Sequence, residues 1–200
     1  MTSRIGDVSA DRRGMTMRPL PDPLEFGYHP VGLPHAWRRI RADMAAGQPA
    51  AMWLDSTAVG NLTSTDEVTQ DGFVSSAIVM GWMAGGMSTS IARLAALAGD
   101  VTGSTPGWTP RDQRSGGLPF DGFSVQLLGT VASPFGPLVS NAHTVAFPVG
   151  DGNAVVIQMA VTAVQDWADA ADGLVLEGTP GASPISPGMA SAQDLVDRDR

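Results

Sequence analysis

The sequence lacks cysteine and lysine, and each absence excludes a class of site. With no cysteine in 200 residues, the chain has neither disulfides nor thiolate metal ligands. All 12 basic residues are arginine, so the lysine of a phosphate-binding P-loop is missing as well. This usage, with much alanine, glycine and aspartate, is typical of a GC-rich genome such as that of an actinobacterium.

Positive charge is also scarce. The chain carries 20 acidic residues against 12 basic ones, giving a formal net charge of −8 and an isoelectric point of about 4.6. Binding to a nucleic acid backbone needs a basic surface, and so does attraction to an anionic membrane. We therefore expect no nucleic acid partner and no membrane partner.

Long uninterrupted apolar runs are missing too. The most apolar window, 77–98, is broken by glycines, a Ser-Thr-Ser run and Arg93, so it does not predict a membrane-spanning helix. Residues 1–17 lack the apolar core of a signal peptide. These observations predict a cytoplasmic acidic protein, or one exported by a route that needs no signal peptide.

The clearest positive signal is a three-stranded meander at Phe123–Val161. Apolar residues alternate with polar ones along 123–131, as in a half-buried strand. A Pro/Gly turn leads to a second strand at 138–147, and Gly150–Asn153 predicts a tight hairpin turn with positive φ angles. The third strand, 154–161, is apolar on both faces, which predicts a central position in the sheet.

The flanking segments give weaker patterns. Trp37, Ile40 and Met44 recur at helical spacing and predict a helix at Pro34–Ala46, with a strand running into Trp37 as the alternative. Short strands are expected at 24–28, 50–54 and 174–177. The Gly/Pro-rich stretch 101–119 predicts a long loop around Trp108.

Two further helices are predicted. Residues 73–98 read as a strand, a turn and a helix that starts at 88 or 89 and ends at Gly99, with one long helix as the alternative. A second helix is expected from Thr162 to Gly173. Together the patterns predict an α+β fold, with an antiparallel sheet of about five to seven strands and two or three flanking helices. This domain would span 19–177, between a flexible leader at 1–18 and a disordered Pro/Gly/Ser-rich tail at 178–200.

The order of these elements resembles that of the small α+β proteins of the Mog1/PsbP-like type. The resemblance lies in the opening motif Gly32–Trp37, the strand-turn-helix at 73–98, and the meander that runs into a helix from Phe147 to Trp167. It implies an antiparallel sheet flanked by helices, and a binding or accessory role. No functional residues carry over from that family.

No catalytic, cofactor-binding or metal-ligating set is predicted. His29, His35 and His143 lie in separate segments without the spacing of a zinc site. Ser140 and His143 are three apart on a predicted strand and so face opposite sides, which excludes a nucleophile–base pair. We expect His143 to be a core or rim histidine with a backbone partner.

Other residue sets have ordinary explanations. Three methionines within 80–87 offer soft ligands for copper(I), but such residues usually fill cores. Three aspartates within 166–172 lack the spacing of a calcium loop and are expected on a solvated helix face.

The candidate interaction residues are Trp108 and an arginine cluster. An exposed tryptophan on a loop is a plausible protein-contact anchor. Arg38, Arg39 and Arg41 form the only dense basic cluster and are able to grip an acidic group, although a solvated face explains them as well.

Three functions stay open at this point. The first is a non-enzymatic protein-interaction or accessory subunit with a protein partner. The second is a small-ligand-binding protein or enzyme with a pocket between sheet and helix, lined by Trp108, His143 and Trp82. The third is a structural subunit of a secretion or phage-like assembly, forming a homo-oligomer through an exposed edge strand.

Overall fold

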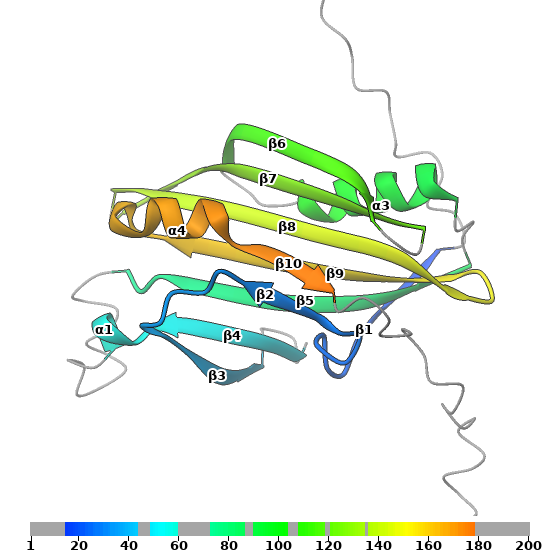
Figure 1. Ribbon diagram of the computed structural model, residues 1–200, viewed down its shortest axis with the longest axis horizontal. Helices are drawn as coiled ribbons and strands as arrows, with labels where there is room; N and C mark the ends of the chain where they lie inside the picture. The colour runs from blue at the N-terminus through cyan, green and yellow to red at the C-terminus, as the bar shows by residue number, and fades with distance from the viewer. Residues whose placement is uncertain are drawn as a thin grey trace, which may run out of the picture.

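The computed structural model describes residues 15–43, 49–59, 73–86, 90–103, 108–118, 121–134 and 136–178. Within these ranges the fold is dominated by β-structure (Figure 1). The strands are β1 (Thr16–Pro19), β2 (Tyr28–Val31), β3 (Trp37–Asp43), β4 (Pro49–Asp55), β5 (Ser76–Gly85), β6 (Trp108–Leu118), β7 (Gly122–Ser133), β8 (Gly136–Gly150), β9 (Asn153–Ala163) and β10 (Val175–Gly178). The helical elements are α1 (Ser56–Val59), α3 (Ile91–Thr102), the 3-10 turn η2 (Gln165–Trp167) and α4 (Ala168–Gly173).

One large antiparallel sheet organises the chain. Its strand order is β3-β4-β5-β9-β8-β7-β6. One edge of β5 pairs with β4 along the first half of β5 and with β1 along its second half. A separate two-stranded sheet joins β2 to β10. The predicted balanced α+β class is therefore wrong: the described residues form ten strands, and the helices are short.

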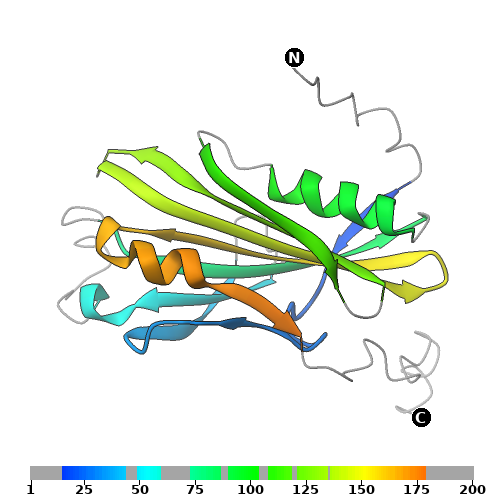
Figure 2. The same cartoon turned by 45° about the horizontal axis from the view of Figure 1, so that its top comes forward.

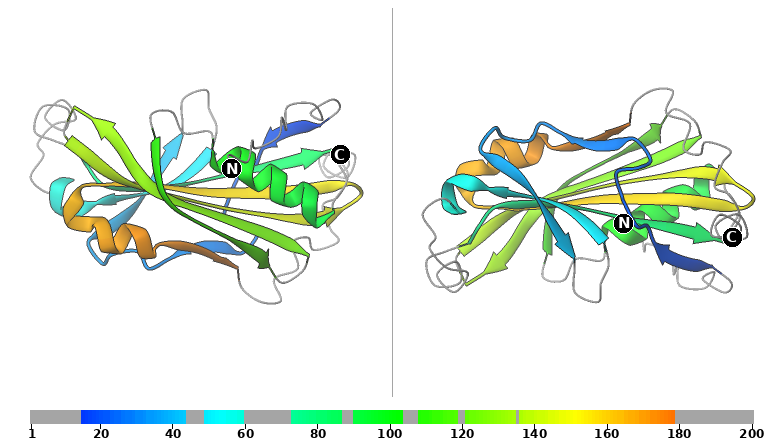
Figure 3. Two further views of the ribbon diagram at one scale, coloured as in Figure 1. Left: turned by 90° about the horizontal axis from the view of Figure 1, so that it is seen from above. Right: turned by 90° about the horizontal axis from the view of Figure 1, so that it is seen from below.

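Helix α3 lies on one face of the large sheet, and α4 with the β2–β10 pair lies on the other (Figures 2 and 3). Each face has its own hydrophobic core. On one face, α3 packs its Leu94, Leu97 and Ala98 against Val125 and Val156. On the other face, α4 and the β2–β10 pair cover a larger cluster that includes Ile157 and Met159. Strand β9 is buried on both sides because it lies between β5 and β8 and has a core above and below it.

The predicted meander is confirmed. Strands β7, β8 and β9 are sequential neighbours, with β9 central in the sheet as expected. The turn between β8 and β9 has positive φ at Gly150, Asp151 and Gly152, which are residue types that tolerate this conformation. The strand-turn-helix prediction for 73–98 is also confirmed by β5 and α3.

Several predicted elements are wrong. Within the expected helix at 34–46, residues 37–43 form the edge strand β3, and 44–46 lie outside the described residues. The alternative of a strand running into Trp37 had the right type of element but not its bounds, since β3 begins at Trp37. The expected loop at 101–119 contains the last residues of α3 and the edge strand β6. The expected helix at 162–173 is shortened, because β9 continues to Ala163 and α4 begins only at Ala168.

The ends of α3 and of the domain also differ from expectation. Helix α3 continues past Gly99 to Thr102, whose hydroxyl lies 2.7 Å from that of Thr144 on β8. This buried tertiary contact stabilises a last turn that the glycine alone does not favour. Strand β1 overlaps the end of the predicted leader at 16–18, while 1–14 and 179–200 lie outside the described residues. No helix in the described ranges is long and apolar enough to cross a membrane.

Candidate ligand site

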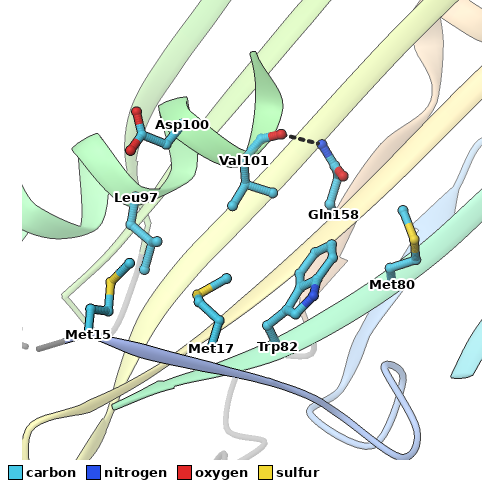
Figure 4. A pocket seen from close by; sticks show the side chains of 8 residues that line it. All are labelled: Met15, Met17, Met80, Trp82, Leu97, Asp100, Val101 and Gln158. Carbon is cyan, nitrogen blue, oxygen red and sulfur yellow. Dashed lines mark hydrogen bonds between the residues drawn. The ribbon is translucent and has the colours of Figure 1, made fainter. Parts of the chain in front are cut away.

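The candidate site is a cavity of about 360 Å³ between α3 and the sheet. Figure 4 shows its lining side chains converging from β5, β9, α3, β1 and the residue just before β1. These residues are Met15, Met17, Met80, Trp82, Leu97, Asp100, Val101 and Gln158. Most are apolar, and the two polar ones lie on the helix side and on β9. A concave apolar site with few polar groups is the usual form of a small-molecule pocket.

The strand pleat explains why these side chains meet. Met80 and Trp82 are two apart on β5 and so project to the same face, toward α3. Met17 pairs with Ala84 of β5 and shares that face. Strand β1 thus adds a short methionine wall beside the tryptophan, and Met17 itself is 36% exposed at the rim.

A polar contact holds the helix over the cavity. The side-chain amide of Gln158 donates a 3.1 Å hydrogen bond to the backbone oxygen of Val101 (Figure 4). Gln158 is otherwise buried in β9, so this bond satisfies a polar group and fixes the end of α3. The cavity therefore has one wall braced by a hydrogen bond and another made of flexible thioether side chains.

Only one titratable side chain, Asp100, is found among the cavity-lining residues in the described part of the chain. The cavity lining contains no histidine and no serine or threonine hydroxyl, so a nucleophile paired with a base is absent from it. In the same described ranges, no group of three or more histidine, aspartate or glutamate residues is arranged to hold a metal ion. The chemistry that the cavity offers is apolar contact.

His143, which the sequence suggested for a pocket, lies on the opposite face of the sheet. It is 8% exposed, and its Nδ1 accepts a 2.8 Å hydrogen bond from the backbone N–H of Leu176 on β10. Burial lowers the pKa of His143 to about 4. The predicted backbone partner is confirmed, while the predicted role in lining a pocket is wrong; of the three residues proposed for that role, only Trp82 lines the cavity.

A buried amide network surrounds this histidine. Asn141 donates hydrogen bonds of 2.7 and 2.8 Å to the backbone oxygens of Ala171 and Leu174, and it accepts one from Gln126. These bonds attach the end of α4 to β8. The network satisfies carbonyls that the short helix leaves open, so its role is structural. As predicted, Ser140 projects to the other face of β8.

The candidate interaction residues do not come together. Arg38 and Arg39 are exposed on β3, and the Arg39 guanidinium lies 5.7 Å from the Trp53 ring centroid. Arg41 is on the same strand, but its side chain lies outside the described part. Trp108 is half-buried on β6, at the opposite edge of the sheet, with its indole against Gly129.

The sequence reasoning missed Met15 and Met17, because both fall in the segment read as a flexible leader. The available signal was their spacing: two methionines two apart share one face of an extended segment. Of the other residue sets, Met80 does line the cavity, whereas Met83 packs in the opposite core. Asp172 forms an ion pair with Arg111, which joins α4 to β6.

Comparison with known proteins finds solved structures with a similar architecture, although sequence comparison finds none. No protein-family model matches the sequence, and no curated protein matches it either. The fold is similar to that of LpqN. That protein, from Mycobacterium tuberculosis, is involved in cell envelope biogenesis. The TM-score is 0.53 with 16% sequence identity, over 81% of this chain and 91% of LpqN. At this identity the likeness to LpqN concerns the fold.

Proposed function

We propose that this chain is a non-enzymatic binding protein that holds an apolar small molecule in the cavity between α3 and the sheet. The observation that carries the proposal is the lining itself, in which methionine and tryptophan side chains face an open space of about 360 Å³. Pockets of this size and polarity suit small apolar ligands. Methionine adds adaptability, since its unbranched side chain fits ligands of different shape.

The setting we propose is an accessory role in a bacterial cell envelope. LpqN, whose fold is similar, is involved in cell envelope biogenesis. Export by a route that needs no signal peptide would be compatible with this setting, and fractionation of the producing cells tests it.

The neutral fluorescent probe N-phenyl-1-naphthylamine tests the binding role directly. We expect saturable binding with a rise in probe fluorescence and a higher thermal midpoint, because the probe binds only the folded chain. Met17→Glu places a charge at the rim and should weaken binding by about tenfold or more. Absence of saturable binding would rule out the proposal.

A matched control is available on the same strand. Thr16 neighbours Met17 on β1 and is also exposed, but its side chain projects to the other face. Thr16→Glu adds the same charge to the same short strand and should leave probe affinity unchanged. Equal losses in both variants would mean that general charge or loss of β1, and not the cavity, controls the signal.

A protein contact at the β3 edge is a second candidate. Arg38 and Arg39 are exposed on a terminal strand of the sheet order, where charged side chains also oppose pairing with another sheet. This arrangement favours an acidic partner over a homo-oligomer built by edge pairing. Light scattering tests it: a stable homo-oligomer that resists high salt would contradict an arginine-based contact.

A further inference from the structure

The apolar lining of the cavity continues across the sheet. Ile78 on β5 lies opposite Met52 on β4, which in turn lies opposite Ile40 on β3. Register places these side chains on the same face as the cavity. Ile78 and Met52 are half-buried, and Ile40 is 39% exposed.

Helix α3 does not cover this part of the sheet. It packs on β7, β8 and β9, and the view from above in Figure 3 shows it crossing that half. In the described ranges the helix in contact with β3 and β4 is the short α1, which follows β4 directly and whose Ser56 N–H bonds to the backbone oxygen of Ala36, just before β3. The apolar strip that α3 leaves uncovered is continuous with the cavity at one end.

Met80 connects the cavity to the apolar strip. It lines the cavity, and it is two residues from Ile78 on the same face of β5. From Trp82 to Ser76 the strand covers about 20 Å at the usual rise per residue. The strip is thus much longer than a compact ligand and suits an extended one.

A cation lies at the far end of the strip. Arg38 pairs with Leu54 across β3 and β4, which places it on the α3 side of the sheet. It is exposed, and one of its terminal nitrogens donates a 3.0 Å hydrogen bond to the backbone oxygen of His35. Among the described strand residues of β3, β4 and β5 that face this side, Arg38 is the only charged one with a described side chain. Arginine stays charged at all physiological pH values and binds carboxylates in a fork geometry.

We infer that the ligand is a long single-chain amphiphile with a carboxylate head group, that is, a long-chain fatty acid. Its chain end occupies the cavity, its chain follows Met80, Ile78 and Met52, and its carboxylate pairs with Arg38. This inference rests on the proposed binding function. It adds the class of the ligand, the direction in which its hydrocarbon chain lies and the residue that binds its head group.

Displacement of N-phenyl-1-naphthylamine by three competitors tests the inference. Hexadecanoic acid has both features, octanoic acid has only a short chain, and hexadecanol lacks the charge. We expect hexadecanoic acid to bind at least about tenfold more tightly than either of the others, because only it fills the strip and also reaches Arg38.

Two neighbouring arginines provide a matched pair of variants. Arg38→Glu should weaken hexadecanoic acid about tenfold or more and leave hexadecanol and the probe unchanged. Arg39→Glu makes the same charge change one residue away, on the opposite face, and should leave all three affinities unchanged. Circular dichroism and thermal melting of both variants establish that they fold.

The outcomes separate this inference from the function on which it rests. If the probe binds but chain length has no effect, or if both arginine variants behave alike, the fatty-acid assignment is overturned while the cavity stays a binding site. The strip would then be left to another occupant, such as a partner helix. If the probe itself does not bind, the proposed function fails first.

Discussion

The backbone N–H of Leu176 donates a 2.8 Å hydrogen bond to the Nδ1 of His143, across the interface between β10 and β8. The bond requires an unprotonated Nδ1, and burial lowers the pKa of this histidine to about 4. The unfolded chain has the ordinary value of about 6.5. The unfolded state therefore binds more protons between these two pH values.

This relationship predicts acid sensitivity. The stability due to neutral His143 is fully present above pH 6.5 and is lost as the pH falls toward 4, with a total of about 3 kcal/mol. Urea unfolding at several pH values checks this. The reference is His143→Gln: its free energy deficit relative to the natural chain should shrink as the pH falls. A deficit that is constant with pH would contradict the assignment.

Gly129 on β7 is predicted to resist any side chain. A Cβ at this position would lie 2.1 Å from the Nε1 of Trp108 and 2.3 Å from the backbone oxygen of Thr109. Gly129→Ala should therefore displace the indole and lower the free energy of unfolding by about 1–3 kcal/mol. Tryptophan fluorescence should shift to the red as Trp108 gains solvent.

Gly117 provides the comparison for this prediction. It lies on the paired strand β6, and a Cβ there meets nothing within 4 Å. Gly117→Ala should leave the fluorescence unchanged and keep or slightly raise stability, since alanine restricts the unfolded chain. Equal destabilisation by both substitutions would show that the contact with Trp108 is unimportant.

Asn141 is predicted to hold α4 and β10 on the sheet. Asn141→Leu keeps the branching at Cγ, with a somewhat larger side chain, but leaves the buried carbonyls of Ala171 and Leu174 without this donor. We expect a loss of about 2 kcal/mol or more. Hydrogen exchange followed by mass spectrometry should show faster exchange in 165–178 and little change in β5. Uniform acceleration across the sheet would argue against a local role.

Asp55 is predicted to anchor η2 to the end of β4. Its carboxylate accepts hydrogen bonds from the hydroxyl and backbone N–H of Thr57, at 2.6 and 2.9 Å, and from the indole N–H of Trp167, at 2.8 Å. Asp55→Ala should cost about 1–3 kcal/mol, because it leaves a half-buried indole N–H unpaired. The double-mutant cycle with Trp167→Phe measures the coupling, and strict additivity would count against it.

The sequence predicts best where both sides of a strand are constrained. In β7, β8 and β9 the alternation of side chains reflects a core on each face, and the hairpin glycines are required by backbone geometry. The sequences of edge strands show much less of this alternation. β6 is exposed over most of its length, so its Gly, Pro and Ser residues are indistinguishable from those of a loop.

The error at β3 has a different cause. Trp37 and Ile40 are three apart, which matches a helical face, but in the structure they lie on opposite faces of a strand, one buried and one 39% exposed. The apparent helical spacing thus arose because Ile40 is apolar although it is exposed. The cavity was not predictable in this way, since it depends on how β1 pairs with β5, and that long-range pairing leaves little trace in local sequence.

The junction between β5 and β9 has a consequence for synthesis. Apart from β1, which is added to the outer edge of β5, the large sheet consists of two sequential meanders, β3–β5 and β6–β9, and they meet only where Ser76 pairs with Thr162 and Ala84 with Ala154. A growing chain cannot join them until its last long strand has left the ribosome. Until then the inner edge of β5 is unpaired, and an unpaired edge on a largely apolar strand is open to pairing with the wrong strand during synthesis.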